Sequence, residues 1–191
     1  EIAQCLVGSE MCIRDRFMRY DEIPKFKNFS IDTNLAYGFV GYINFIHDAV
    51  QNQGLQMQPW FQRQHVWTED QQIAYIEFFL KGGISGRDVF FNLNLSTGEF
   101  ICVDGLQRTT AMERFVDNEI CAFGQHCSDF GFPIRDVAGI PSADFKVNVH
   151  MNHLETHREI LEWYYSLNSG GTPHSKEELD KIRQFIAETT D

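Results

Sequence analysis

Apolar residues recur at helical spacing in two stretches of the first half of the chain. Between residues 35 and 53 they fall three or four positions apart, and Asp32 or Thr33 precedes them as a candidate cap. Thr68 begins a capping box, and the apolar stripe that follows it stops at Gly82. The pattern therefore predicts one helix from about residue 35 to 53 and a second that begins after Thr68.

The middle of the chain changes to strand-like patterning. Residues 89–95 and 100–103 are apolar runs separated by a short polar turn with Gly98, which predicts a β-hairpin. A helix is expected directly afterwards, over residues 106–117. The pattern then weakens, and we expect a strand near residues 120–123 followed by loop up to residue 144.

The last third of the chain combines one strand with two helices. Residues 145–151 alternate apolar and polar side chains, as in a half-buried strand. Thr156 and Ser175 each stand three residues before a Glu, so each is expected to cap a helix. The whole pattern predicts an α/β (α+β) fold, with a small mixed sheet flanked by helices, in a single domain over residues 17–191.

Composition limits the possible functions. The chain has 191 residues, 17 of them Phe, and a formal net charge of −11. Such an acidic protein is a poor candidate for broad, non-specific nucleic-acid binding, although a local basic pocket stays possible. No apolar run approaches the roughly 20 residues of a membrane span, and we expect a cytoplasmic protein with no membrane contact.

The first sixteen residues are set apart from this interpretation. Residues 5–16 have the sequence CLVGSEMCIRDR, which resembles translated read-through of a sequencing adapter. We therefore expect residues 1–16 to be non-native and the true N-terminus to be missing. The remaining cysteines, Cys102, Cys121 and Cys127, are odd in number and form no C-x-x-C pair. We expect reduced, mostly buried thiols rather than a disulfide framework or a zinc site.

The stretch most typical of ligand binding is the expected strand–turn–helix junction at Asp104 and Gly105. A helix that opens after such a turn directs backbone N–H groups and the positive end of its dipole at one point, which favours an anion. Arg108 in the first turn adds a planar fork of donors that matches phosphate oxygens. Asp104 could cap this helix, hold a metal or orient a water. The junction indicates a nucleotide or another phosphate ligand.

Two further segments could contribute to the same site. Gln62 and Arg63 lie shortly before the helix that Thr68 caps. Asn168, Gly170 and Gly171 belong to a loop between the last two expected helices, where the backbone could approach a ligand closely.

In this order, the three segments resemble the N-terminal domain of the GmrSD-type, DUF262 family. The family motifs are a Gln-Arg-x-x-x-Trp segment, an Asp-Gly-Gln-Gln-Arg motif after a strand, and an Asn-x-Gly-Gly stretch that leads to Ser-x-x-Glu-Leu. The corresponding segments here are QRQHVW at residues 62–67, DGLQR at 104–108 and NSGGTPHSKEEL at 168–179. The resemblance covers roughly residues 55–185.

The resemblance implies a ParB/sulfiredoxin-like fold and a role in DNA restriction or phage defence. Such domains bind and hydrolyse nucleoside triphosphates, with Mg²⁺ expected, and control a separate HNH-type nuclease that cuts the DNA. Asp104 and Arg108 would be the catalytic residues. The expected nucleotide-binding residues are Gln62, Arg63, Gly105, Gln107, Arg108, Thr109, Asn168, Gly170 and Gly171.

The chain departs from the family pattern at three positions, one of which is His174, where a Leu is common. Leu106 replaces the first Gln of the Asp-Gly-Gln-Gln-Arg motif, and Ser166 stands where an Arg is common. Both changes weaken the case for efficient hydrolysis more than the case for binding. The alternative hypotheses are a non-enzymatic, ParB-like DNA-binding or regulatory module and, less favoured, a stand-alone nuclease.

Histidines offer little support for a metal-dependent nuclease. His150, His153 and His157 could form a metal cluster, but one falls in an expected strand and another at a helix start. We favour histidines that are hydrogen-bonded within the protein or exposed to solvent, and we interpret His126 beside Cys127 in the same way.

Overall fold

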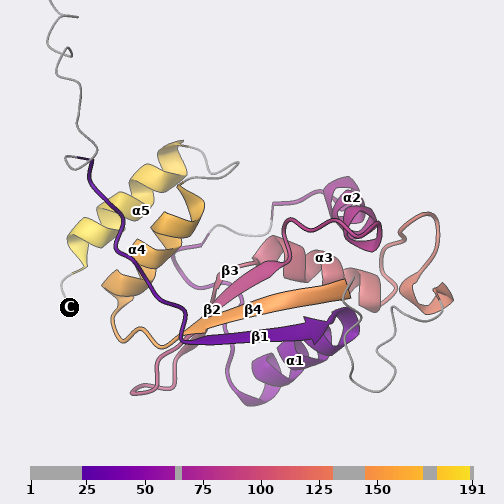
Figure 1. Cartoon of the computed structure of the whole chain (residues 1–191), viewed down its shortest axis with the longest axis horizontal. Helices are drawn as coiled ribbons and strands as arrows, with labels where there is room; N and C mark the ends of the chain where they lie inside the picture. The colour runs from indigo at the N-terminus through magenta and orange to yellow at the C-terminus, as the bar shows by residue number, and fades with distance from the viewer. Residues whose placement is uncertain (1–22, 63–65, 131–144, 170–175, 190–191) are drawn as a thin grey trace, which may run out of the picture.

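The computed structural model describes residues 23–62, 66–130, 145–169 and 176–189. Within these residues the chain forms four strands, five α-helices and a short 3-10 helix (Figure 1). The strands are β1 (Thr33–Gly38), β2 (Asp88–Leu93), β3 (Phe100–Asp104) and β4 (Lys146–Asn152). The helices are α1 (Phe39–Asn52), α2 (Glu69–Leu80), α3 (Leu106–Val116), η3 (Cys127–Asp129), α4 (His157–Asn168) and α5 (Lys176–Glu188).

The four strands form one mixed sheet in the order β1-β4-β2-β3. β1 pairs with β4 and β2 pairs with β3 in antiparallel fashion, whereas β2 and β4 run parallel. A mixed sheet with flanking helices is an α+β arrangement, so the predicted fold class is confirmed.

Each face of the sheet has its own apolar core. The first cluster includes Val89, Phe91, Val147 and Val149 and joins the sheet to α1, α2 and α3. The second cluster is smaller and joins β3 to α4 and α5. Figure 1 shows α4 and α5 side by side at one end of the molecule, away from α1.

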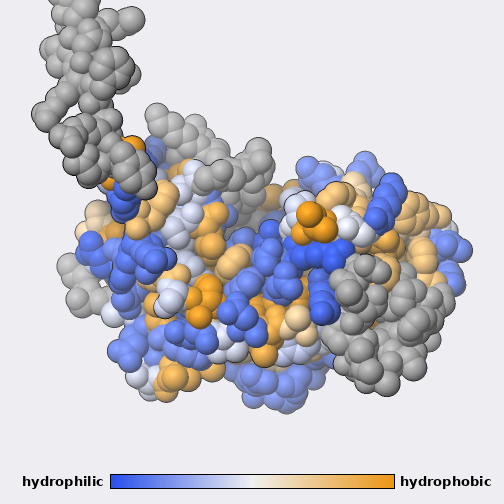
Figure 2. Space-filling model, viewed as in Figure 1, coloured by the Kyte–Doolittle hydropathy of each residue, from blue (hydrophilic) through white to orange (hydrophobic). Residues whose placement is uncertain are grey.

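The outer surface of the described residues agrees with the acidic composition. Figure 2 shows hydrophilic residues spread over much of the visible face, with separated apolar patches between them. Among the exposed large apolar side chains of the described residues, Ile84 has the highest exposed fraction, 86%.

Local capping signals predicted several elements correctly. Thr68 accepts a hydrogen bond from the Gln71 backbone N–H and forms a complete capping box at the start of α2. Thr156 caps α4 in the same way through the Glu159 backbone N–H. The hairpin of β2 and β3, the helix α3 and the strand β4 are also confirmed. The predicted cap Ser175 lies outside the described residues.

The predicted helix over residues 35–53 is wrong at its start. Residues 33–38 form β1, and α1 begins only at Phe39 with Gly38 as its N-cap, so neither Asp32 nor Thr33 caps it. Every residue of β1 pairs with a residue of β4. Pairing with a strand more than 100 positions away overrides the local helical spacing in this segment.

The predicted strand near residues 120–123 is also wrong. Only an isolated bridge between Ala122 and Gln125 forms there, and the turn bends through Phe123 at φ 52°. The prediction of mostly buried, reduced thiols is confirmed, because Cys102 and Cys127 are buried, Cys121 is half-buried, and none of the three is in a disulfide within the described structure. Burial raises the pKa of the Cys102 thiol above its ordinary value.

Candidate functional site

The junction between β3 and α3 is built around Gly105. This residue is the N-cap of α3 and has φ 129°, a conformation that L side chains rarely adopt. A Cβ added here would also lie 2.8 Å from Val89 Cγ1 on the neighbouring strand β2. Glycine therefore lets the chain turn tightly out of β3 and start α3 close against the sheet.

The N-cap residue of α3 is Gly105, which has no side chain with which to cap the helix. Asp104 precedes the N-cap residue and makes no cap hydrogen bond, so the predicted capping role for Asp104 is wrong. Its carboxylate instead accepts a hydrogen bond from Arg108 one turn later, with 2.7 Å between Oδ2 and Nη2. The absence of a side-chain cap leaves the positive end of α3 available to an anion.

Arg108 is a largely buried cation with an unused donor. Its side chain is 22% exposed, and its Nε is buried without a hydrogen-bond partner in the described structure. Asp104 accepts its hydrogen bond from Nη2, so the ion pair leaves Nε unsatisfied. Burial lowers the pKa of Arg108, but the Asp104 carboxylate raises it by more, so the guanidinium stays charged.

Arg108 lies against the loop that leads from α2 into β2. A Cβ at Gly86 would lie 3.7 Å from Arg108 Cδ and 3.5 Å from the Tyr75 ring. The Tyr75 hydroxyl donates to the Gly86 carbonyl over 2.9 Å and thereby fixes this loop. Burial raises the pKa of Tyr75 to about 12, so its hydroxyl remains a donor at neutral pH.

The two glutamines of the expected site form hydrogen bonds with backbone groups of the described residues. Gln62 donates through Nε2 to the carbonyls of Cys102 and Val103, each over 2.6 Å. Gln107 accepts from the backbone N–H groups of Val66 and Trp67 through Oε1. Both residues therefore dock the segment before α2 onto the β3–α3 junction, which places them beside Arg108 in a supporting position.

Thr109 belongs to the core. It is 1% exposed, and its Oγ1 lies 2.7 Å from the Tyr42 hydroxyl on α1. This position leaves its side chain no access to a ligand and gives it a role in fixing α3 against α1. Its spacing from the buried residues Leu106 and Met112 is the sequence signal that predicts this.

The third motif is only partly described. Asn168 ends α4, and its Nδ2 donates to the Tyr164 carbonyl of the same helix. Arg63, Gly170 and Gly171 lie outside the described residues. Among the described residues, the structure therefore joins Gln62, Asp104, Gly105, Gln107 and Arg108 at one junction, with no hydrogen bond from Asn168 to it.

Two of the three departures from the family motifs, Leu106 and Ser166, lie in the described part of the chain, and His174 lies outside it. Leu106 is 8% exposed at the first turn of α3, so it contributes apolar contact where a polar group was expected. Ser166 lies on α4, and its hydroxyl donates to the Trp163 carbonyl over 2.8 Å. Neither residue supplies charge to a ligand.

One group of side chains in the described structure could hold a metal ion. His47 on α1 and Glu113 and Asp117 at the end of α3 bring ligand atoms within 4.8 Å of one another. One imidazole with two carboxylates suits a transition metal better than Mg²⁺, which prefers oxygen ligands. The group lies at the opposite end of α3 from Asp104, so it does not serve a nucleotide bound at the junction.

The other histidines have separate partners. His150 lies between Asn34 and Asp88, at 2.6 and 2.8 Å. His153 contacts the Leu93 carbonyl and His157 contacts Glu99. The interpretation of these residues as satisfied histidines is confirmed.

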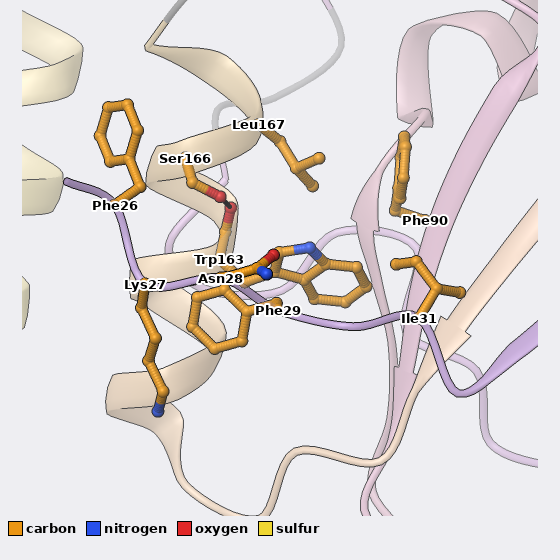
Figure 3. A pocket seen from close by; sticks show the side chains of 9 residues that line it. All are labelled: Phe26, Lys27, Asn28, Phe29, Ile31, Phe90, Trp163, Ser166 and Leu167. Carbon is orange, nitrogen blue, oxygen red and sulfur yellow. Dashed lines mark hydrogen bonds between the residues drawn. The ribbon is translucent and has the colours of Figure 1, made fainter.

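A pocket on the α4 side of the sheet was missed by the sequence interpretation. It has a volume of about 330 Å³ and lies between α4, Phe90 of β2 and residues 26–31 (Figure 3). Trp163 and Phe90 are 73 positions apart in the sequence. No local pattern predicts that these two segments meet.

Comparisons with known proteins add no identification. No family model, no curated protein and no solved structure matches the chain. Within the described residues, no helix is long and apolar enough to cross a membrane. The function is therefore argued from the site itself.

Proposed function

We propose that the chain is a nucleotide-binding domain that takes the phosphates of a nucleoside triphosphate at the β3–α3 junction. The observation that carries this proposal is Arg108, a charged guanidinium whose buried Nε donates to no described residue. A buried donor on a charged group without an acceptor costs about 1–3 kcal/mol or more, and phosphate oxygens would remove that cost.

The surroundings of Arg108 fit an anion in three respects. The start of α3 has no side-chain cap, Gly105 allows close approach of the backbone, and Tyr75 fixes the adjoining loop through Gly86. Asp104 partly neutralises Arg108 through one carboxylate oxygen. This ion pair keeps the guanidinium in one orientation before a ligand arrives, which reduces the entropy lost on binding.

The residues also fit the Mg²⁺ that accompanies a triphosphate. Asp104 Oδ1 accepts no hydrogen bond from a described residue, while Oδ2 is bound to Arg108. Mg²⁺ is commonly held by one or two carboxylates together with phosphate oxygens. Asp104 would hold the ion, whose chemistry is to neutralise charge on the phosphates, and Arg108 would orient the same phosphates.

A direct test is a calorimetric titration with ATP, GTP, CTP and UTP in the presence of Mg²⁺. Arg108→Ala should weaken binding at least tenfold, as expected for loss of charge-assisted hydrogen bonds. Arg114→Ala is the matched control, because Arg114 lies on the same helix but pairs with Glu69 and Glu119. If all four nucleotides fail to bind, or bind Arg108→Ala as tightly as the wild type, the proposal is wrong.

Hydrolysis is tested separately through Asp104. The rate of phosphate release from a nucleoside triphosphate is measured for the wild type and for Asp104→Asn. If the variant still binds the nucleotide but releases phosphate at least 100-fold more slowly, Asp104 has a catalytic role. Equal release by both proteins would exclude that role and leave a binding domain.

The motif resemblance adds partners to the proposal. It supports a cytoplasmic domain of a restriction or phage-defence system that acts on DNA through a separate HNH-type nuclease. The check is whether a co-expressed HNH-type protein encoded next to this chain co-purifies with it and cuts DNA in a nucleotide-dependent way. Nucleotide-independent cutting would contradict control by this domain.

A further inference from the structure

The pocket beside α4 has walls made mostly of aromatic rings. Phe90, Phe29 and Trp163 line it, and Phe26 stands at its mouth (Figure 3). Phe90 is stacked on His150, with ring centroids 4.8 Å apart, and meets the Trp163 ring edge-on at 6.0 Å. These contacts hold the aromatic walls in place, so the pocket can accept a flat ring at little cost of ordering.

Trp163 brings an unused donor into this pocket. The residue is 2% exposed, and no described residue accepts a hydrogen bond from its indole N–H, which is not itself among the fully buried donors without a partner. Figure 3 shows the indole nitrogen on the ring edge that faces Leu167 and the open space beside Phe90. An indole N–H that borders the pocket and has no acceptor among the described residues is available to a ligand there.

Polar groups stand at the mouth of the pocket. The Lys27 ammonium is held by Glu159 at 2.7 Å and lies 5.0 Å from the Phe29 ring centroid. The Asn28 side-chain amide makes no hydrogen bond to a described residue and offers both a donor and an acceptor. A ligand that fills the pocket would therefore meet apolar rings inside and the Asn28 amide beside them, while the Lys27 ammonium is paired with Glu159.

We propose that this pocket binds a planar heteroaromatic ring with a hydrogen-bond acceptor on its edge, which is the chemistry of a nucleobase. The ring stacks among the aromatic walls and accepts the hydrogen bond of Trp163. Ligand pockets usually measure about 300–1,000 Å³, so 330 Å³ suits one base or nucleoside. Such a base could belong to a free nucleotide or to an unpaired position of a DNA strand.

The pocket is separate from the proposed phosphate site at Arg108. Arg108 packs near Tyr75, which belongs to the apolar cluster on the α1–α3 side of the sheet. Trp163 and Phe90 belong to the cluster on the α4–α5 side. The two proposals can therefore fail independently, and a nucleoside without phosphates tests only the pocket.

The test follows the indole N–H resonances of the ¹⁵N-labelled protein during titration with adenosine, guanosine, cytidine and thymidine. The chain has three Trp residues, so the Trp163 signal is assigned by its loss in Trp163→Phe. We expect at least one nucleoside to move the Trp163 signal to saturation while the signals of Trp60 and Trp67 stay in place.

Matched variants separate the pocket from the rest of the molecule. Trp163→Phe keeps a ring but removes the donor and should weaken nucleoside binding about three- to tenfold. Phe90→Ala should weaken it further, whereas Trp60→Phe and Arg114→Ala should leave it unchanged. Trp60 serves as the control because it is 57% exposed and makes edge-to-face contacts with Phe61 and Phe185 instead.

A single-stranded oligonucleotide distinguishes the two sources of the base. Binding at least tenfold tighter than the free nucleoside, without binding of the duplex, indicates an unpaired DNA base. Similar affinities indicate a free nucleotide. If neither probe moves the Trp163 signal at millimolar concentration, or if Phe90→Ala and Trp163→Phe bind like the wild type, the proposal is overturned.

Discussion

The two faces of the sheet use neighbouring residues of the same strand for different purposes. Phe91 of β2 points into the core toward α1, is fully buried, and contacts the rings of Phe45 and Phe100. Phe90 points to the other side, where it is half-buried and lines the pocket next to Trp163. The face toward α1 is filled by packed side chains, whereas the face toward α4 contains the pocket.

The polar content of the two faces differs in the same way. On the α4 side, Asp88 accepts hydrogen bonds from Asn148 and contacts His150, while Asn34 contacts His150 from β1. On the α1 side, the corresponding positions of β2 and β4 are Val89, Phe91, Val147 and Val149, each at most 1% exposed. The α1 side of the sheet therefore contributes most of the stability. Groups that could bind a ligand lie on the α4 side and at the β3–α3 junction beside Arg108.

The largest expected effect is on the face toward α1. Phe91→Ala should lower the free energy of unfolding by about 3–5 kcal/mol, because it removes a fully buried ring and leaves a cavity. Phe90→Ala should cost only roughly 1–2 kcal/mol, since its ring already borders open space. Urea unfolding of both variants measures the difference, and equal losses would contradict the contrast between the faces.

The next effect concerns the turn that starts α3. Gly105→Ala should lower the free energy of unfolding by about 2–4 kcal/mol, because it combines a strained φ with a clash against Val89. Gly98→Ala is the control, since Gly98 also has a positive φ but has no atom within 4 Å of an added Cβ. It should cost about 1 kcal/mol. A loss at Gly105 no larger than at Gly98 would show that close approach to β2 is unimportant.

The smallest effect concerns the segment that covers the face toward α4. The hydrogen bond from Lys27 is the main cause that lowers the pKa of Glu159 below its ordinary value. A lowered folded-state pKa gives stability that is present above the unfolded pKa and is lost as the pH falls through the folded pKa. Because both groups are partly exposed, the contribution should be at most about 1 kcal/mol.

Lys27→Met tests this contribution. Between pH 7 and pH 3 the wild type should lose more unfolding free energy than Lys27→Met, because the variant has less of this stabilisation to lose. Lys81→Met is the control, since the Lys81 ammonium lies over the Phe123 ring. An identical acid dependence in wild type and Lys27→Met would show that the pair contributes nothing.

Local chemistry made much of the fold predictable. The caps at Thr68 and Thr156, and the turn between β2 and β3, act within a few residues, so the sequence contains the whole signal. β1 was missed because its partner β4 is distant, and its apolar residues also fit a helical period. Element type is thus readable where the contacts that decide it are local.

The candidate site was predictable only in part. Asp104, Gly105 and Arg108 follow one another on a strand–turn–helix, so their meeting could be anticipated. The packing of α3 decides two further contacts, which the sequence does not reveal. Arg108 pairs with the Asp104 carboxylate, and Thr109 forms a hydrogen bond with Tyr42. The pocket at Trp163 depends entirely on tertiary contact.

The central claim is that phosphate groups bind at Arg108. The most direct measurement is a titration of the ¹⁵N-labelled protein with inorganic tripolyphosphate and Mg²⁺, which follows the Arg108 Nε–H and the Trp163 indole N–H in one spectrum. Arg108 Nε–H should move to saturation while the Trp163 signal stays in place, because Arg108 is the arginine with a buried, unpartnered Nε among the described residues. An Arg108 signal that does not move while tripolyphosphate is in excess would contradict the account.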